Sequence, residues 1–422
     1  MRQSLHMGIA IWTPLSYRPI RRIWLGQVLA AIGAELYAVV VLWTAIGLVG
    51  RDAGYIATLQ AAAVLLGSLF AGALTESWRH TTVMITADLA RVGMVLVLPV
   101  ADALGWMSPG LLLVVAGCVG LATGWFEPAL QATLTPLAPE PGLRHTSNAL
   151  FDATRRLARI AGPMLVYLLQ RAMSTIDFFV VTAVSFAASA AAVASMVALT
   201  VPVVAKTGHG GARAGLDAVI GGFRALRGRP LALYALCAAA VANITWAGGY
   251  LFGMALVFRV ERPEALTGFA AMTLAYGVGN LISNLVLANA PPANAARRIA
   301  ISKLILGAGI SLLALGPSLP VLMLIAALTA VNGPLGDLAV LHVLQSSFSA
   351  AALGRVFRAQ TCIAWGGMLA GYVLAPTLLS WVAASTMVAM LGALSAIIGL
   401  VGFGLARWGW IPAGPSPQVT AA

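Results

Sequence analysis

Charged residues are scarce in this sequence. They make up 9% of its 422 residues, whereas hydrophobic residues make up 60%, and the mean hydropathy is +0.92. A soluble globular domain is roughly 25% charged, so this chain has too few charges to cover a surface exposed to water. The shortage excludes a soluble protein and indicates that most of the chain lies in lipid.

Residues that bind metals or carry covalent chemistry are also rare. The three cysteines (Cys118, Cys237 and Cys362) lie in apolar stretches far from one another, which argues against a disulfide framework. The five histidines are scattered, so no cluster has metal-ligand spacing, and we expect neither a metal nor a cofactor. The sequence has no Walker-type phosphate loop, nucleophile elbow or His-Glu-x-x-His motif, which argues against an ATP-driven pump and against an enzyme.

Long apolar stretches are abundant instead. A stretch of about 20 apolar residues can cross the hydrocarbon core of a bilayer. The first stretch is too long for a cleaved signal peptide, so we expect it to remain in the mature protein. The twelve predicted spans are 23–49, 54–76, 81–103, 109–134, 147–171, 176–201, 231–257, 265–289, 299–316, 319–343, 356–381 and 384–406.

These spans predict an all-α membrane protein of twelve transmembrane helices in two six-helix bundles. The N-terminal bundle would cover 1–201, and the C-terminal bundle with its tail would cover 231–422. The linker 202–230 has apolar residues at the spacing of a basic amphipathic helix lying on the membrane surface. They are Leu216, Val219, Ile220, Phe223 and Leu226.

The net charge of +12 fits a membrane protein of defined orientation. Twenty Lys and Arg fall in segments on the side of the N-terminus and four on the opposite side, and Arg91, inside a span, completes the 25. The positive-inside rule then places both termini and the linker in the cytoplasm of a bacterial inner-membrane protein. Because these residues lie between apolar stretches rather than in one patch, we reject a nucleic-acid partner. The expected partners are the lipid bilayer, a small organic substrate and protons, and we expect a monomer.

The two halves share short local patterns at similar spacing, which supports a duplication of one six-helix unit. The matched segments are Arg18-Pro19 with Arg229-Pro230, Pro128 with Pro334, and Gly142-Leu143-Arg144 with Leu353-Gly354-Arg355.

Three segments carry a family resemblance: Gly33-Ala34-Glu35-Leu36-Tyr37, the run 125–134 with Glu127-Pro128, and Ser147-Asn148-Ala149-Leu150 followed by Arg159-Ile-Ala-Gly162-Pro163. With them the chain resembles the major facilitator superfamily. It is most similar to the bacterial branch of enterobactin-type siderophore exporters and macrolide-type drug:proton antiporters. The resemblance implies two six-helix bundles and secondary transport, but it names no substrate.

One loop departs from the superfamily pattern Gly-x-Leu-x-Asp-Arg-x-Gly-Arg. Here it runs from Gly72 through Glu76 to His80, with Glu in place of Asp and Ser in place of the first Arg. We expect Glu76 to face the N-terminus of span eleven, where the helix dipole favours an anion, and so to latch the cytoplasmic gate. With fewer basic partners, this latch would be weaker than usual.

Ionisable residues inside spans need a partner, water or a function, because a charge in lipid is costly. Glu35 lies near the middle of span one. It is the leading candidate for proton coupling or for binding a substrate cation, and the alternative is a hydrogen bond to a neighbouring helix. Asp88 and Arg91 are three residues apart on span three and can pair on one face. This pair is either structural or lines the cavity.

A second group of charges lies in the cytoplasmic thirds of spans four and five. Asp152, Arg155, Arg156 and Arg159 share one helical face, and Glu127 can pair with Arg155 or Arg159. We favour a structural and gating network. The rival is an anion site for a carboxylate- or catecholate-bearing siderophore, formed by surplus arginines.

Asp337 is expected to be the only ionisable residue well inside a C-terminal span. It is either a second coupling acid or the cap of a helix interrupted at Asn332-Gly333-Pro334, and we favour the cap. Uncharged polar residues mark further possible cavity faces, although interhelical hydrogen bonding explains each of them as well. They are Gln27, Asn243, Trp246, Asn280 and Asn284.

Together these features predict a proton-coupled exporter of a siderophore or drug-like organic molecule, working by alternating access. Two alternatives stay open. One is a lysophospholipid flippase or other lipid carrier of the same superfamily, and the other is a membrane scaffold or sensor that transports nothing.

Overall fold

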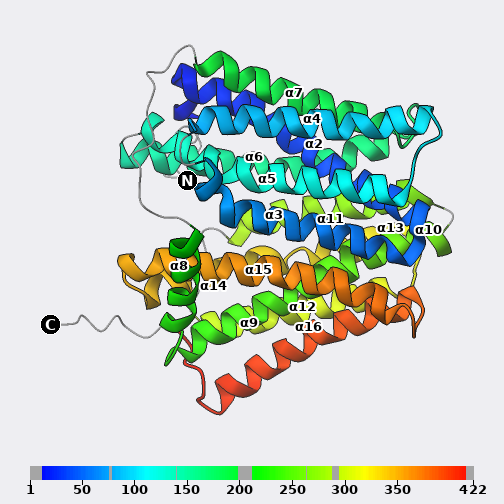
Figure 1. The fold of residues 1–422 in the computed structure, drawn as a ribbon. Helices are drawn as coiled ribbons and strands as arrows, with labels where there is room; N and C mark the ends of the chain where they lie inside the picture. The colour runs from blue at the N-terminus through cyan, green and yellow to red at the C-terminus, as the bar shows by residue number, and fades with distance from the viewer. Residues whose placement is uncertain are drawn as a thin grey trace. The chain divides into compact units, whose positions relative to one another are not determined.

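The computed structural model describes residues 12–75, 78–138, 140–197, 212–262, 264–287 and 294–414, and the regular elements of these residues are helical (Figure 1). The helices of the first half are α2 (Arg18–Val49), α3 (Ala53–Thr75), α4 (His80–Ala103), α5 (Pro109–Leu137), α6 (Pro141–Leu169) and α7 (Asp177–Val197). Those of the second half are α8 (Ala212–Ala225), α9 (Pro230–Ile244), the π-helix η3 (Thr245–Gly253), α10 (Met254–Glu261), α11 (Ala265–Leu287), α12 (Ala295–Leu313), α13 (Leu319–Thr329), α14 (Asn332–Ser347), α15 (Ala350–Leu378) and α16 (Ala384–Arg407).

Each predicted span corresponds to one helix or to helices that follow one another directly. Nine segments of the described residues are long and apolar enough to cross a membrane, and the first, Arg18–Leu69, includes both α2 and most of α3. The helices α6 and α12 are not among the nine because α6 carries Asp152 and three arginines close together and α12 carries two arginines and a lysine. Their lengths of 29 and 19 residues are still those of spanning helices.

The chain divides into two compact units. Unit 1 comprises Met1–Leu48 and Ala62–Ala212, and unit 2 comprises Val49–Ala61 and Arg213–Ala422. The first turns of α3 thus belong to unit 2, where Gly54 packs against Pro376 and Arg51 donates to the carbonyl of Leu379 at 3.5 Å. Almost all of the linker helix α8 also belongs to unit 2, where Gly222 lies directly on the backbone carbonyl of Arg355.

The helix boundaries repeat between the two halves. The helix α5 begins at Pro109, directly after the N-cap Ser108, and α13 begins at Leu319, directly after the N-cap Ser318. The turns before them contain Gly105 and Gly316, whose φ angles are +71° and +64°. The helices α6 and α15 are both 29 residues long. These regularities agree with the duplication that the sequence patterns predict.

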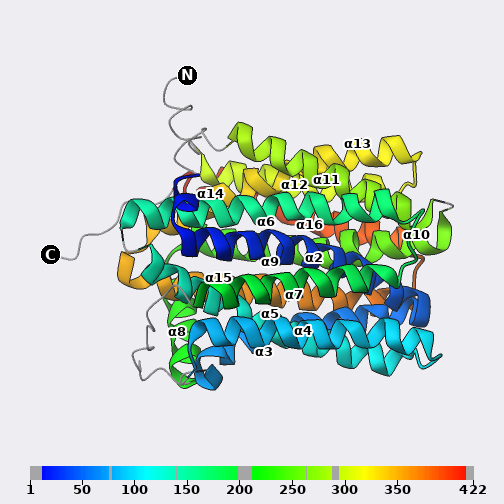
Figure 2. The ribbon, with the colours of Figure 1, turned by 90° about the horizontal axis from the view of Figure 1, so that it is seen from above.

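Within unit 1, α4 packs against both α5 and α7 (Figures 1 and 2). Its buried residues Val83, Met84 and Ala87 join a core that includes Ile23 of α2 and Phe126 of α5. Within unit 2, α12 runs along α16, and a second core forms where α9, α12 and α14 meet. Each unit therefore has a hydrophobic core of its own.

Glycines let helices of one unit approach closely, and one of them offers a test of the packing. A Cβ added to Gly124 of α5 would lie 2.7 Å from the Ser68 nitrogen and would also meet Val64 and Gly67 of α3. We expect Gly124→Val to destabilise the protein by about 1–3 kcal/mol through overpacking, measured by unfolding of the purified protein in detergent.

The matched control lies on the same helix. No atom stands within 4 Å of a Cβ built on Gly110, so Gly110→Val should leave stability nearly unchanged. An equal loss in both variants would show that valine is simply unfavourable in α5 and that the contact between α3 and α5 does not limit stability.

Candidate functional site

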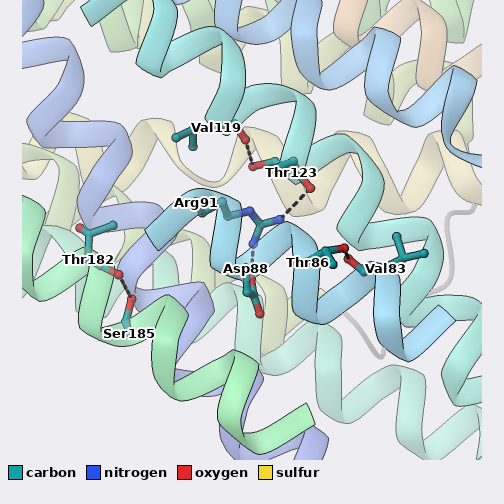
Figure 3. Close-up of polar contacts among 9 residues, drawn as sticks. Val83, Thr86, Asp88, Arg91, Val119, Thr123, Thr182 and Ser185 are labelled. Carbon is teal, nitrogen blue, oxygen red and sulfur yellow. Dashed lines mark hydrogen bonds and ion pairs between the residues drawn. The ribbon is translucent and has the colours of Figure 1, made fainter. Parts of the chain in front are cut away.

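Asp88 and Arg91 of α4 form a sealed ion pair (Figure 3). The guanidinium Nη1 of Arg91 donates to Asp88 Oδ1 at 2.9 Å. The side chain of Arg91 is 5% exposed, and that of Asp88 is 0% exposed. Arg91 also donates to the Ala122 carbonyl at 3.3 Å and lies over the rings of Phe126 and Phe186, 4.7 and 5.1 Å from their centroids. Because Arg91 thereby joins α4 to α5 and α7, the burial favours the structural reading of this pair.

Glu35 and Arg159 form an ion pair of the opposite kind. Glu35 lies near the middle of α2, and its Oε1 is 3.6 Å from Nε of Arg159 on α6. That separation is longer than a hydrogen bond, and the side chains are 37% and 65% exposed for Glu35 and Arg159. Gly162, one turn beyond Arg159, makes the approach possible, because a Cβ there would lie 2.7 Å from that of Glu35. The pair is therefore loose, and the protein covers it only in part.

Two further arginines of α6 have carboxylate partners. Arg155 donates to Glu127 at 3.1 Å, which is one of the two pairings considered from the sequence, and Arg156 donates to Asp152 at 2.8 Å. Since Arg159 faces Glu35, each of these three arginines has a carboxylate partner. The surplus of arginines on which the anion-site alternative depends is therefore not present among them.

Asp337 does not cap a helix. The chain is interrupted between α13 and α14 as expected, but α14 begins at Asn332 and its N-cap Val331 makes no side-chain capping bond. Asn332 stabilises the interruption instead, donating to the carbonyl of Thr329 at 2.7 Å and to the hydroxyl oxygen of Tyr276 at 3.1 Å. The capping interpretation of Asp337 was wrong because the helix starts more than one turn before it.

Lys303 is the residue that the sequence analysis missed. It lies on α12 with only 4% of its surface exposed and interacts electrostatically with Asp337. Its Nζ lies 3.4 Å from a Cβ built on the adjacent Gly336, so that glycine makes room for the ammonium. Asp337 is therefore not the only ionisable residue inside a C-terminal span. The available signal was position, because Lys303 falls within the predicted span 299–316.

This pair repeats an arrangement of unit 1. Glu127 and Asp337 occupy the same position relative to the N-caps of their helices, Ser108 and Ser318 respectively. Each acid interacts with a buried cation of the preceding span, Arg91 for Glu127 and Lys303 for Asp337. At these matching positions each unit thus has an acid that interacts with a buried cation, although the ion pair of Glu127 itself is with Arg155.

The uncharged polar candidates differ in their burial and in their hydrogen-bond partners. Gln27 is buried in α2, and its Nε2 has no hydrogen-bond partner among the described residues. Asn243 donates to the Ala239 carbonyl of its own helix at 2.8 Å, and Asn280 donates to the Ala330 carbonyl at the α13–α14 interruption at 3.3 Å. Asn284 follows Asn280 by one turn on α11 and is half-buried.

Trp246 belongs to a ring cluster in the π-helix η3, with Tyr250 of the same helix and Tyr276 of α11. Neither the π-helix nor the contribution of Tyr276 was predicted from the sequence.

The gate motif can be followed only in part. Gly72 lies near the end of α3, while Glu76 lies outside the described residues, so the latch stays a prediction. Among the described residues, no group of three His, Cys, Asp or Glu side chains is placed to hold a metal ion.

The fold is that of known transporters. The chain is similar to a POT family transporter in complex with a thioalcohol-conjugated peptide (TM-score 0.74, 10% identity, 93% of this chain and 96% of that chain covered). It is also similar to an auto-inhibited POT family peptide transporter, with a TM-score of 0.69 and 14% identity over 96% of this chain and 99% of that chain. A third similar structure is a POT family transporter in complex with 5-aminolevulinic acid, with a TM-score of 0.70 and 10% identity over 93% of this chain and 96% of that chain. No protein-family model and no curated protein sequence matches the chain. At these identities the similarity shows the fold alone, and the all-helical membrane fold is as predicted.

The sealed pair leads to a stability prediction. Arg91→Met leaves the Asp88 carboxylate buried without its counterion, and we expect a loss of about 3–5 kcal/mol. The double variant Asp88→Leu with Arg91→Met removes both charges and should be clearly more stable than the single variant. Chemical unfolding in detergent measures both, and additive losses would contradict the pairing.

The pair in unit 2 should respond asymmetrically. Asp337→Asn removes the acid that interacts with the buried Lys303 and should destabilise the protein, because a buried ammonium without a compensating anion is costly. Lys303→Met removes the buried charge and leaves Asp337 exposed to water, so its cost should be much smaller. Thermal unfolding of the two single variants and the double variant tests this order, and the reverse order would show that Lys303 does not depend on Asp337.

Proposed function

We propose that this protein is a proton-coupled exporter of a small organic molecule, such as a siderophore or a drug-like compound, and that it works by alternating access. The observation that carries the proposal is the contrast between two of the ion pairs of unit 1, both inside predicted spans. Asp88–Arg91 is short and sealed from solvent, whereas Glu35–Arg159 is long and accessible. A coupling acid has to exchange its proton with water, and of these two pairs only Glu35–Arg159 is left partly uncovered by the protein.

Glu35 can act as the coupling residue for a simple electrostatic reason. When the carboxylate is ionised it attracts Arg159, and when it takes up a proton that attraction is lost. Because the contact is only a loose one at 3.6 Å, the two side chains can separate without breaking a short hydrogen bond. Proton binding at Glu35 would thereby change how α2 is held to α6 within unit 1, which gives a proton a way to bias the conformation.

The fold supports transport over the scaffold alternative. Two repeated six-helix halves, 1–201 and 231–422 on either side of the linker, would move as the two bodies of alternating access. The Lys and Arg distribution supports an inner-membrane protein with cytoplasmic termini. Glu76 would latch the cytoplasmic gate, and the sequence resemblance supports the siderophore and drug exporter branch.

The test is transport by purified protein in proteoliposomes with an imposed pH gradient, using a radiolabelled catecholate siderophore and a radiolabelled macrolide. An antiporter moves the label toward the acidic side, and one pH unit supports about tenfold accumulation for one proton exchanged. We expect Glu35→Gln to abolish this accumulation while label still equilibrates across the membrane, because the variant cannot bind and release a proton.

Glu264→Gln is the matched control, since Glu264 lies between α10 and α11 and pairs with Arg262 at 3.1 Å. This variant should accumulate label as the wild type does. Accumulation by Glu35→Gln with unchanged pH dependence would refute the coupling role. Movement of labelled lysophospholipid in place of both compounds would favour the lipid carrier, and binding without flux would favour the scaffold.

A further inference from the structure

The π-helix η3 is the most irregular part of unit 2. It covers Thr245–Gly253 between α9 and α10, in the middle of a predicted span. A π-helix closes i→i+5 hydrogen bonds, is rare, and is frequent at functional sites. Its wider turn brings side chains four residues apart nearly above one another. That geometry places the rings of Trp246 and Tyr250 4.4 Å apart at an interplanar angle of 9°.

Tyr276 of α11 completes a cluster of three rings. Its centroid lies 4.6 Å from that of Trp246 and 5.0 Å from that of Tyr250. Tyr250 is fully buried, and its hydroxyl donates to the Met272 carbonyl at 3.4 Å, so it belongs to the core. Trp246 differs, because it is only half-buried and its indole N–H has no hydrogen-bond partner among the described residues.

The open side of the cluster is polar. Asn243 precedes Trp246 by three residues on α9, and Asn280 follows Tyr276 by four on α11. Asn332 holds the Tyr276 hydroxyl from the start of α14. Side chains that face lipid are apolar, and polar residues in spans face the bundle interior or a water-filled cavity. The amides therefore indicate that Trp246 faces the interior of the bundle rather than lipid.

The repeat supports a role for the same position. Glu35 and Trp246 stand at the same distance along the chain from Pro19 and Pro230 respectively, the two prolines being matched starts of the halves. The position that carries the candidate coupling acid in unit 1 therefore carries an accessible indole in unit 2. A ring that only filled the core would have no reason to occupy this position with its N–H unpaired.

We propose that Trp246, backed by Tyr250 and Tyr276, is a binding platform for an uncharged planar aromatic group of the transported molecule. The ring stacks on the indole face, and a carbonyl or hydroxyl oxygen at its edge accepts the indole N–H. The ligand group is uncharged because the cluster and its three amides, Asn243, Asn280 and Asn332, contain no charged side chain. This inference rests on the proposed transport function and adds a substrate class to it.

The test uses the full chain in lipid nanodiscs and two neutral probes of similar size, 4-hydroxybenzamide and its saturated analogue 4-hydroxycyclohexanecarboxamide. Saturation-transfer NMR titrations give the affinity of each. We expect the wild type to prefer the aromatic probe, and Trp246→Ala to weaken its binding about five- to tenfold. Trp246→Phe keeps a ring but removes the N–H and should give an intermediate loss.

Trp381→Ala is the matched control, because Trp381 is 83% exposed beyond the end of α15, away from the cluster. It should bind the aromatic probe as the wild type does. Two results would overturn the platform even if Trp246→Ala fails to fold. One is that the wild type and Trp246→Phe bind the aromatic probe with equal affinity. The other is that the wild type does not prefer the aromatic probe over the saturated one.

Binding in nanodiscs requires no flux, so the two proposals fail separately. Gradient-driven transport that depends on Glu35, with no effect of Trp246 variants on aromatic binding, would overturn the platform alone. Stacking at Trp246 without transport of any tested compound would leave the platform standing and overturn the exporter.

Discussion

The attraction between opposite charges inside a low-dielectric layer is the interaction on which this protein depends. An ionised side chain in lipid costs several kcal/mol unless a partner or water compensates it, and a span has few places for either. The polar interior of this chain is organised accordingly. Arg91 is matched by Asp88, Arg155 by Glu127, Arg156 by Asp152, and Lys303 by Asp337.

The role of such an ion pair depends on how short it is and on how deeply the protein buries it. A short, buried pair can be structural: Asp88 compensates the charge of Arg91 within α4, and Arg91 in turn contacts α5 and α7. A long pair with access to water can be opened and closed by one proton. Unit 1 contains both kinds, in Asp88–Arg91 and Glu35–Arg159. Unit 2 has a buried lysine, Lys303, near the exposed Asp337, and it has an aromatic cluster at the position where unit 1 has Glu35.

Much of this fold follows from sequence because the rules involved are local. A sufficiently long apolar run forms a span wherever it occurs, and charges three or four residues apart share a face, which predicts Asp88–Arg91. The partner of Glu35 could not be predicted in this way, since Arg159 is far away along the chain and depends on α2 packing against α6 at Gly162. Lys303 was missed because counting basic residues by side assigns a lysine near the end of a span to the loop.

Asp337 and η3 show a second limit. The role of Asp337 depended on the residue at which α14 starts, and because the helix begins at Asn332, Asp337 lies within it rather than at its cap. The π-helix has no composition that distinguishes it from α-helix, because its wider turn is stabilised by packing such as that of Gly248 against Gly371. Glu76 and the substrate itself stay predictions that follow from resemblance and charge pattern.

The sealed pair in α4 has a consequence for how this sequence can evolve. Most proteins have a total stability of only about 5–15 kcal/mol, and losing one member of a buried pair consumes a large part of it. A lineage therefore cannot easily exchange Asp88 or Arg91 one at a time, although an apolar pair in their place would be viable. The two residues are entrenched together, and they should persist or disappear as a unit among descendants of this chain, whatever molecule those descendants carry.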